Sequence, residues 1–381
     1  MKRMKMTGFR NLSDILDEVH RLASVDAEAV EDRLTQCKEL QEQAKDTFEA
    51  TGEDKETYAQ IVYAVADFLS DNYGDDIATE LYLRHLALCE ELYGPDSIQS
   101  IDTLSNIGAI YIFNDPKTAL KYLMKALEIR EKSEDIGKDE VAKNCWMIAF
   151  VLKNVGNFQL SVEFLEKAQK LYAACGKMDE VVSLQQQIAR TYEQQGLFEK
   201  AIQRYEKILE WASERGEVSA DLDVASVHNA IGLIFSKRGE NERALYYITR
   251  AAEIAEKTQG YFNEDTGSYY NNAGVVCARL SDFHGMSENI EKALEIRKKV
   301  LDMDDLKLAE TYTLYGLVQA SRGNIPLALS NFYKSLAIKK KMLGSDSEEV
   351  KRYKELVSIF TKKGWEKFGE KFTLSKWLPS L

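Results

Sequence analysis

The sequence predicts an all-α fold, a solenoid built from antiparallel pairs of helices. Three observations lead to this prediction. Small residues return about every 42 positions along most of the chain. Apolar residues between them follow spacings of three and four, as a buried helix face requires. The 381 residues include only 4 prolines and 21 glycines, which favours long helices joined by short turns.

One predicted unit is easily seen in residues 188–212. Ala189 stands where the first helix must let the second approach closely. Gly196 ends the first helix and permits a turn. Ala201 is the small residue of the second helix, and Tyr205 continues its apolar stripe four positions later. These residues together predict two packed antiparallel helices.

The same arrangement predicts about seven helix pairs in series. The small residue of the first helix is Ala66, Gly108, Ala149, Ala189, Gly232, Gly274 and Gly316 in turn. A small residue of the second helix follows 11 or 12 positions later in six of the pairs. The sixth pair has Met286 at this place, preceded by Gly285. Because glycine costs about 1 kcal/mol in a helix interior, we expect a distorted or late-starting helix there.

The apolar pattern divides the chain into four parts. Residues 1–57 are expected to form a helical pair that caps the array, with a dimerising hairpin as the alternative. Residues 58–346 contain the array, and residues 347–363 a capping helix. The tail, residues 364–381, alternates aromatic and basic side chains. Packing on the last helix, a partner motif, a self-inhibitory segment and a weak membrane-surface anchor remain open for it.

The repeats resemble a known family. The second helices end alike, with ALEIREK at 126–132, ALEIRKK at 293–299 and SLAIKKK at 335–341. Their period is longer than the about 34 residues of the common tetratricopeptide repeat. They resemble the long tetratricopeptide repeats of kinesin light chains and bacterial relatives, although the coiled coil of a kinesin subunit is absent. The resemblance implies a right-handed superhelical solenoid whose first helices line a concave, peptide-binding groove.

Composition narrows the class of partner. The formal net charge of −12 disfavours nucleic acid, because nonspecific binding needs Lys and Arg at phosphates. The five cysteines form no C-x-x-C pair and are odd in number, so a disulfide framework or a zinc site is not expected. No run approaches the roughly 20 apolar residues that span a bilayer. We expect a cytoplasmic protein without a metal or other cofactor.

Catalysis is not expected either. The four histidines lie far apart in the sequence, and no H-E-x-x-H, phosphate-binding loop or nucleophile elbow occurs. The predicted function is therefore non-enzymatic. A Cys–His pair assembled by the fold is the form that an unrecognised site would take.

The first helices supply the candidate binding residues. Positions around each small residue should face the groove, and there they are rich in amides, aromatic rings and cations. The candidates are Lys143, Trp146, Phe150, Lys153, Asn154, Gln186, Gln187, Arg190, Asn229, Lys237, Asn271, Asn272 and Arg279. The cations form a basic strip in an acidic protein, which favours an acidic peptide. Trp146 and Phe150 would be its apolar anchor. Ordinary solvated helix faces would also carry such residues.

Two functions follow from this pattern. The first is a scaffold or adaptor that binds a peptide or a partner protein in the groove. The alternative is a peptide-sensing regulator of a signalling partner. The layout of an N-terminal helical pair and about seven repeats resembles that of the bacterial Rap regulators, although their functional residues have no match here.

Overall fold

The computed structural model describes residues 11–23, 30–52, 54–72, 75–214, 224–361 and 378. Every regular element in these ranges is helical. The elements are α1 Leu12–Ala23, α2 Val30–Thr51, α3 Lys55–Asn72, α4 Asp75–Tyr93, the 3-10 turn η1 Ile98–Ser100, α5 Ile101–Ile110, α6 Pro116–Lys132, α7 Lys138–Asn154, α8 Phe158–Ala174, α9 Met178–Gln194, α10 Phe198–Glu214, α11 Val224–Lys237, α12 Asn241–Thr258, α13 Glu264–Arg279, α14 Phe283–Val300, α15 Leu306–Ser321, α16 Ile325–Leu343 and α17 Glu348–Ile359.

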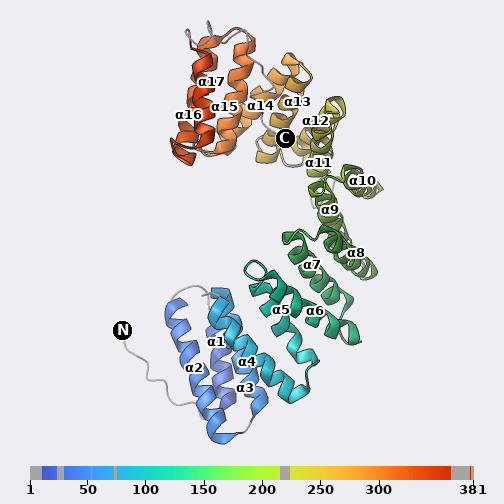
Figure 1. Ribbon diagram of the computed structural model, residues 1–381, viewed down its shortest axis with the longest axis vertical. Helices are drawn as coiled ribbons and strands as arrows, with labels where there is room; N and C mark the ends of the chain where they lie inside the picture. Colours follow the sequence, from blue (N-terminus) through green and yellow to red (C-terminus); the bar gives the residue numbers. More distant parts are fainter. Residues whose placement is uncertain are drawn as a thin grey trace. The chain divides into compact units, whose positions relative to one another are not determined.

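These helices form sequential hairpins, so the predicted all-α fold of paired helices is confirmed. The chain divides into two compact units, Met1–Thr191 and Tyr192–Leu381. In the first unit α3 packs on α4, α5 on α6 and α7 on α8, and in the second α11 packs on α12, α13 on α14 and α15 on α16 (Figure 1). The N-terminal helices α1 and α2 both contact α3, and α17 contacts α16. No described helix is long and apolar enough to cross a membrane.

The predicted small residues lie where the two helices of a hairpin come closest. A Cβ added to Gly232 would stand 2.6 Å from Cγ1 of Ile248 and 3.1 Å from the carbonyl oxygen of Ala244. A Cβ on Gly316 would stand 2.4 Å from the ring of Phe332. At these points the backbone of the first helix lies directly against side chains of the second helix. A side chain in place of the glycine would push the two helices apart.

The turns inside the hairpins share one geometry. Gly156, Gly239 and Gly323 follow their first helices with φ between 77° and 79°, a region that glycine adopts without strain. In the sixth pair Ser281 takes this conformation, and Asp282 then caps α14 by accepting a hydrogen bond of 2.9 Å from the backbone N–H of Gly285.

The helix α14 consequently starts at Phe283 and runs for 18 residues. The expectation of a distorted or late-starting helix in the sixth pair is therefore wrong. Gly285 lies in the first turn, where it meets its capping residue. A Cβ at this position would stand 2.3 Å from Oδ2 of Asp282. The glycine thus serves the cap and does not interrupt the helix.

Each of the three similar second-helix endings, in α6, α14 and α16, contains a buried basic residue. Arg130 of α6 and Arg297 of α14 are 7% and 4% exposed. Arg130 donates to Asn144 Oδ1 at 2.9 Å, and Arg297 donates to Thr311 Oγ1 at 2.7 Å. At the equivalent place in α16, Lys339 pairs with Glu349 and lies 4.4 Å from the ring centroid of Tyr353. Each basic residue links its second helix to the helix that follows.

The apolar cores follow the same order. One cluster joins α1 to α5 in the first unit, and another joins α13 to α17 in the second. Leu378 is partly buried against the second cluster. The rest of the predicted tail, residues 364–377 and 379–381, lies outside the described residues.

Candidate functional site

A partly exposed aromatic group lies on α7 and on the turn between α5 and α6 in unit Met1–Thr191. Trp146 and Phe150, one turn apart on α7, have ring centroids 6.1 Å apart. Phe113, in the turn before α6, meets Phe150 edge-on at 6.1 Å. The side chain of Trp146 remains 39% exposed and that of Phe113 77% exposed. Three neighbouring aromatic side chains therefore reach solvent, on the face that carries the predicted groove residues.

Several of the predicted amides join neighbouring repeats by hydrogen bonds. Gln187 of α9 accepts a hydrogen bond of 2.9 Å from the indole N–H of Trp146. In the second unit Asn272 of α13 donates to Asn229 Oδ1 of α11 at 3.1 Å. The paired residues are 41 and 43 positions apart, about one repeat. Asn106 makes a similar contact between repeats, since its Nδ2 atom lies 3.4 Å from the hydroxyl of Tyr63, 43 positions earlier.

A second row of cross-repeat contacts runs nearer the ends of the first helices. Lys237 pairs with Glu193 at 2.7 Å. Arg279 donates to the hydroxyl of Ser236, and burial lowers the pKa of its guanidinium. Asn271 differs from its neighbour Asn272, since it is 4% exposed and accepts a hydrogen bond of 3.1 Å from Thr311. Asn271 is thus part of the packing between α13 and α15.

These contacts change the charge of the predicted basic strip. Lys143 pairs with Glu140 at 2.6 Å, and Lys237 pairs with Glu193. Lys153 of α7 and Arg190 of α9 have no ion pair or hydrogen bond within the described part of the chain, and both reach solvent. Lys153 and Arg190 therefore bring positive charge without a described carboxylate partner to the first unit, on the helices that hold Trp146 and Gln187. Two further predicted side chains there, Asn154 and Gln186, also lack a side-chain partner among the described residues.

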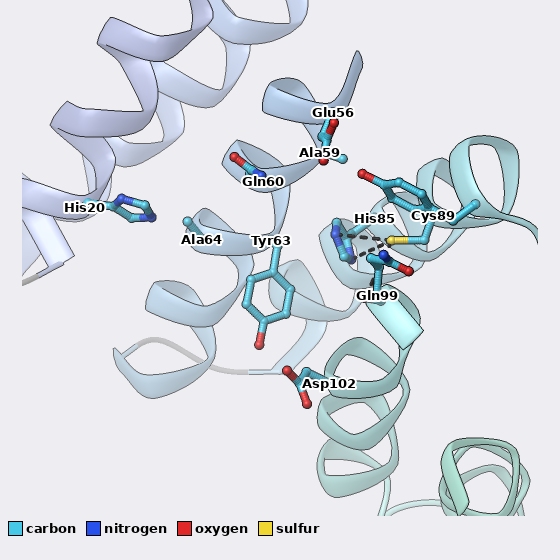
Figure 2. Close-up of a pocket in the computed structure, with 11 residues that line it drawn as sticks. His20, Glu56, Ala59, Gln60, Tyr63, Ala64, His85, Cys89, Gln99 and Asp102 are labelled. Atoms are coloured by element: carbon cyan, nitrogen blue, oxygen red, sulfur yellow. Dashed lines mark hydrogen bonds between the residues drawn. The ribbon is translucent and has the colours of Figure 1, made fainter. Parts of the chain in front are cut away.

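The structure also contains a cavity that the sequence patterns do not indicate. It has a volume of about 360 Å³ and lies in the first unit, between α1, α3, α4, η1 and α5 (Figure 2). Its lining residues are His20, Glu56, Ala59, Gln60, Tyr63, Ala64, His85, Cys89, Tyr93, Gln99 and Asp102. Figure 2 shows Glu56 and Asp102 at opposite ends of the row of lining side chains, with Tyr63 and His85 between them. This volume is within the range of small-molecule sites.

A histidine and a cysteine meet at the wall of this cavity. The Sγ atom of Cys89 lies 3.4 Å from Nε2 of His85, one helical turn away on α4. Nδ1 of His85 lies 2.6 Å from Oγ1 of Thr103. Burial raises the pKa of the Cys89 thiol to about 11 and lowers the pKa of His85 to about 4. Both groups are therefore neutral near pH 7, unlike the thiolate–imidazolium pair of a cysteine nucleophile.

Sequence reasoning missed the cavity for a simple reason. Its walls come from five separate elements, so no spacing along the chain marks them. The one local signal is the four-residue separation of His85 and Cys89, which places both on one face of α4. Within the described ranges, no group of three or more His, Cys, Asp or Glu side chains could hold a metal ion.

Two family models match parts of the chain. Residues 68–132 match the tetratricopeptide repeat, and residues 112–225 match the soluble NSF attachment protein, SNAP. The repeated helix hairpins and the first match define a tetratricopeptide-repeat protein, which has a protein-interaction fold. No curated protein matches the chain significantly.

Several solved structures are similar at low identity. The quorum sensor NprR from B. thuringiensis, in its apo form, is 18% identical, with 92% of this chain and 98% of that chain covered and a TM-score of 0.48. A Rap protein complexed with Competence and Sporulation Factor is 15% identical, with coverages of 93% and 99% and a TM-score of 0.40. BtubC (BKLC) from P. vanneervenii is 17% identical, with coverages of 84% and 95% and a TM-score of 0.33.

Proposed function

We propose that this protein binds a peptide or a segment of a partner protein on the first helices of unit Met1–Thr191. The observation that carries the proposal is the exposed aromatic group of Phe113, Trp146 and Phe150. Exposed clustered aromatic side chains are costly in water and are the usual anchors of protein interfaces. The protein would act as a scaffold or adaptor.

The charges beside this group select an acidic segment. Lys153 and Arg190 carry positive charge that no described carboxylate neutralises. A carboxylate of the ligand would therefore gain a charge-assisted hydrogen bond without displacing an existing ion pair. The amide of Gln186 can donate to and accept from the backbone of an extended peptide.

Labelled peptides of defined composition test this proposal. Fluorescence polarisation would compare a peptide of glutamates around one leucine with its lysine counterpart. The acidic peptide should bind more tightly, and Trp146→Ala or Arg190→Glu should weaken it about tenfold or more. Lys170→Glu makes the same charge change on α8, outside this face, and should have little effect. Equal affinity for the two peptides would contradict the proposal.

A peptide-sensing regulator is the second candidate function. The cross-repeat contacts of unit Tyr192–Leu381 favour it, because a peptide could compete for the partners of Asn229, Asn272 or Lys237. Such competition would alter how neighbouring repeats are held together. X-ray scattering distinguishes the candidates, since a ligand-induced fall in radius of gyration supports a regulator and an unchanged radius supports a rigid adaptor.

Binding without catalysis is part of the same proposal. The neutral thiol of Cys89 and the neutral imidazole of His85 support it, because neither is poised to attack a substrate. A hydrolase screen with acyl, phosphoryl and glycosyl substrates should show no turnover. Turnover that Cys89→Ser or His85→Gln abolishes would overturn this part of the proposal.

A further inference from the structure

The cavity in the first unit has acidic ends and no strongly basic lining residue. Glu56 stands at one end and Asp102 at the other, and no lysine or arginine of the described residues lines the space between them (Figure 2). His85 is 8% exposed and holds no charge near pH 7, and His20 is the other basic group at the wall. The lining therefore supplies two carboxylates and no described lysine or arginine. Arg130, outside the lining, pairs with Asp102 at 3.7 Å, so the excess of acidic groups at the wall favours a cationic ligand.

The middle of the cavity is aromatic and apolar. The ring of Tyr63 lies 5.2 Å from that of His85, and Ala59, Ala64 and Cys89 complete the surface around it. Tyrosine faces attract cations and also pack on methylene groups. The side-chain oxygen atoms of Gln60 and Gln99 can accept hydrogen bonds from a donor-rich ligand.

The length of the cavity follows from helix geometry. Glu56 and Tyr63 are both on the lining face of α3, seven residues apart, which corresponds to about 10 Å along the helix axis. Asp102 lies beyond Tyr63 (Figure 2), and burial, together with the negative charges of Asp67 and Asp102, raises the pKa of that tyrosine to about 12. The two carboxylates are thus separated by an elongated, largely apolar space.

Existing partners leave both carboxylates able to accept. The hydroxyl of Tyr93 bonds to Glu56, and this raises the pKa of Tyr93 to about 12. Asp102 lies 3.7 Å from a guanidinium nitrogen of Arg130, and its side chain is still 77% exposed. A carboxylate has about four acceptor positions, so each can take an ammonium group in addition.

We propose that this cavity binds a linear aliphatic polyamine, with one ammonium group at Glu56, another at Asp102 and the methylene chain against Tyr63. The chemistry of the ligand is that of a flexible chain with a cation at each end. A single lysine side chain shares the ammonium group and the methylenes, but it can satisfy only one carboxylate. This inference is independent of the peptide site on α7 and α9.

Calorimetric titration of the full chain with spermidine at physiological ionic strength tests the proposal. The expected result is saturable binding of one spermidine per chain. N-acetyl-lysine amide should bind about tenfold more weakly because one charge-assisted contact is lost, and 1,5-pentanediol should not bind. Equal affinity for spermidine and the lysine derivative would overturn the two-carboxylate arrangement.

Variants separate a built site from general attraction to an acidic protein. Glu56→Gln and Asp102→Asn should each weaken spermidine binding about tenfold, whereas Glu90→Gln removes an exposed carboxylate outside the cavity and should leave it unchanged. Ala64→Leu keeps every charge and narrows the space, so it should also reduce binding. The proposal would be overturned if Glu90→Gln lowered the affinity for spermidine as much as Glu56→Gln does. It would also be overturned if magnesium ion bound the same site with the same affinity as spermidine. Circular dichroism checks that each variant is folded.

A last control keeps this inference distinct from the proposed peptide site. Trp146→Ala should weaken peptide binding about tenfold or more and leave spermidine binding intact. Simultaneous loss of both in Trp146→Ala would show that the two sites are not separate, and it would overturn this inference.

Discussion

The indole N–H of Trp146 donates a 2.9 Å hydrogen bond to the amide oxygen of Gln187, which lies 41 residues further along the chain. The bond fixes one edge of the indole against the next repeat and leaves part of the ring exposed to solvent. Asn272 and Asn229 repeat this relationship between α13 and α11. Side chains that are predicted to face the groove can therefore also hold neighbouring repeats together.

The first prediction concerns this bond. Trp146→Phe and Gln187→Leu each remove one partner, and each should lower the free energy of unfolding. A double-mutant cycle in urea should give a coupling energy of about 0.5–1.5 kcal/mol, the usual net value of such a bond. A coupling energy near zero would mean that the two groups do not interact in solution.

The second prediction concerns helix approach. Gly232→Ala should lower the free energy of unfolding by about 1–3 kcal/mol, because its new methyl group meets the backbone of α12. Gly274→Ala is the matched comparison, since its nearest contact is the tip of Ile290 at 2.5 Å, which can rotate away. Urea unfolding of both variants measures the difference. A cost for Gly274→Ala equal to or above that for Gly232→Ala would count against this explanation.

The third prediction concerns the buried arginine of α14. Arg297 donates to Thr311 Oγ1, to the carbonyl oxygen of Lys307 and to Ser268 Oγ. Arg297→Met should lower the free energy of unfolding by about 1–3 kcal/mol, because these acceptors lose a buried donor. Lys298→Met, at the exposed neighbouring position, should change it by less than about 0.5 kcal/mol. Thermal denaturation of the two variants provides the comparison, and similar melting temperatures would refute the prediction.

The fourth prediction concerns pH. Burial lowers the pKa of His85 from 6.5 to about 4, so between these values the unfolded chain binds more protons at this site than the folded chain does. The contribution of His85 to stability is complete above pH 6.5 and is lost as the pH falls towards 4. At pH 5 the loss should be about 2 kcal/mol.

His85→Gln removes this titration and keeps a polar group near Thr103. Between pH 7 and pH 5 the free energy of unfolding should fall for both proteins. The fall should be smaller for the variant than for the wild type, and the difference should be about 2 kcal/mol. His20→Gln, at an exposed wall position, should follow the wild-type curve more closely. If His85→Gln and the wild type give parallel curves, His85 is not held neutral by burial.

Much of the fold can be predicted from sequence because close helix packing leaves a local mark. Where two backbones approach, the side chain must be small, and Gly108, Gly232, Gly274 and Gly316 show this constraint directly. The exception was Gly285, whose role in the cap of α14 depends on the neighbouring Asp282. A glycine near a helix start has two explanations, and the spacing of small residues alone does not separate them.

The candidate site was less predictable, since its contacts lie between repeats. Asn271 and Asn272 are adjacent in the sequence, yet the first is buried against Thr311 and the second reaches Asn229. Adjacent helix positions differ by about 100° in direction, so a small rotation of α13 decides which of them packs and which faces solvent. Their types alone could not distinguish these environments.

By itself, the sequence determined the helical class, the period of the repeats and the places of closest helix approach, because these depend on the size of single side chains at regular intervals. Only the tertiary structure decided that Lys237 pairs with Glu193, whereas Lys153 and Arg190 meet no carboxylate among the described residues, and that five elements line a cavity between Glu56 and Asp102. The physical reason is that electrostatic pairing and enclosed volume depend on distances between atoms far apart in the chain. Those distances are set by how whole helices stack.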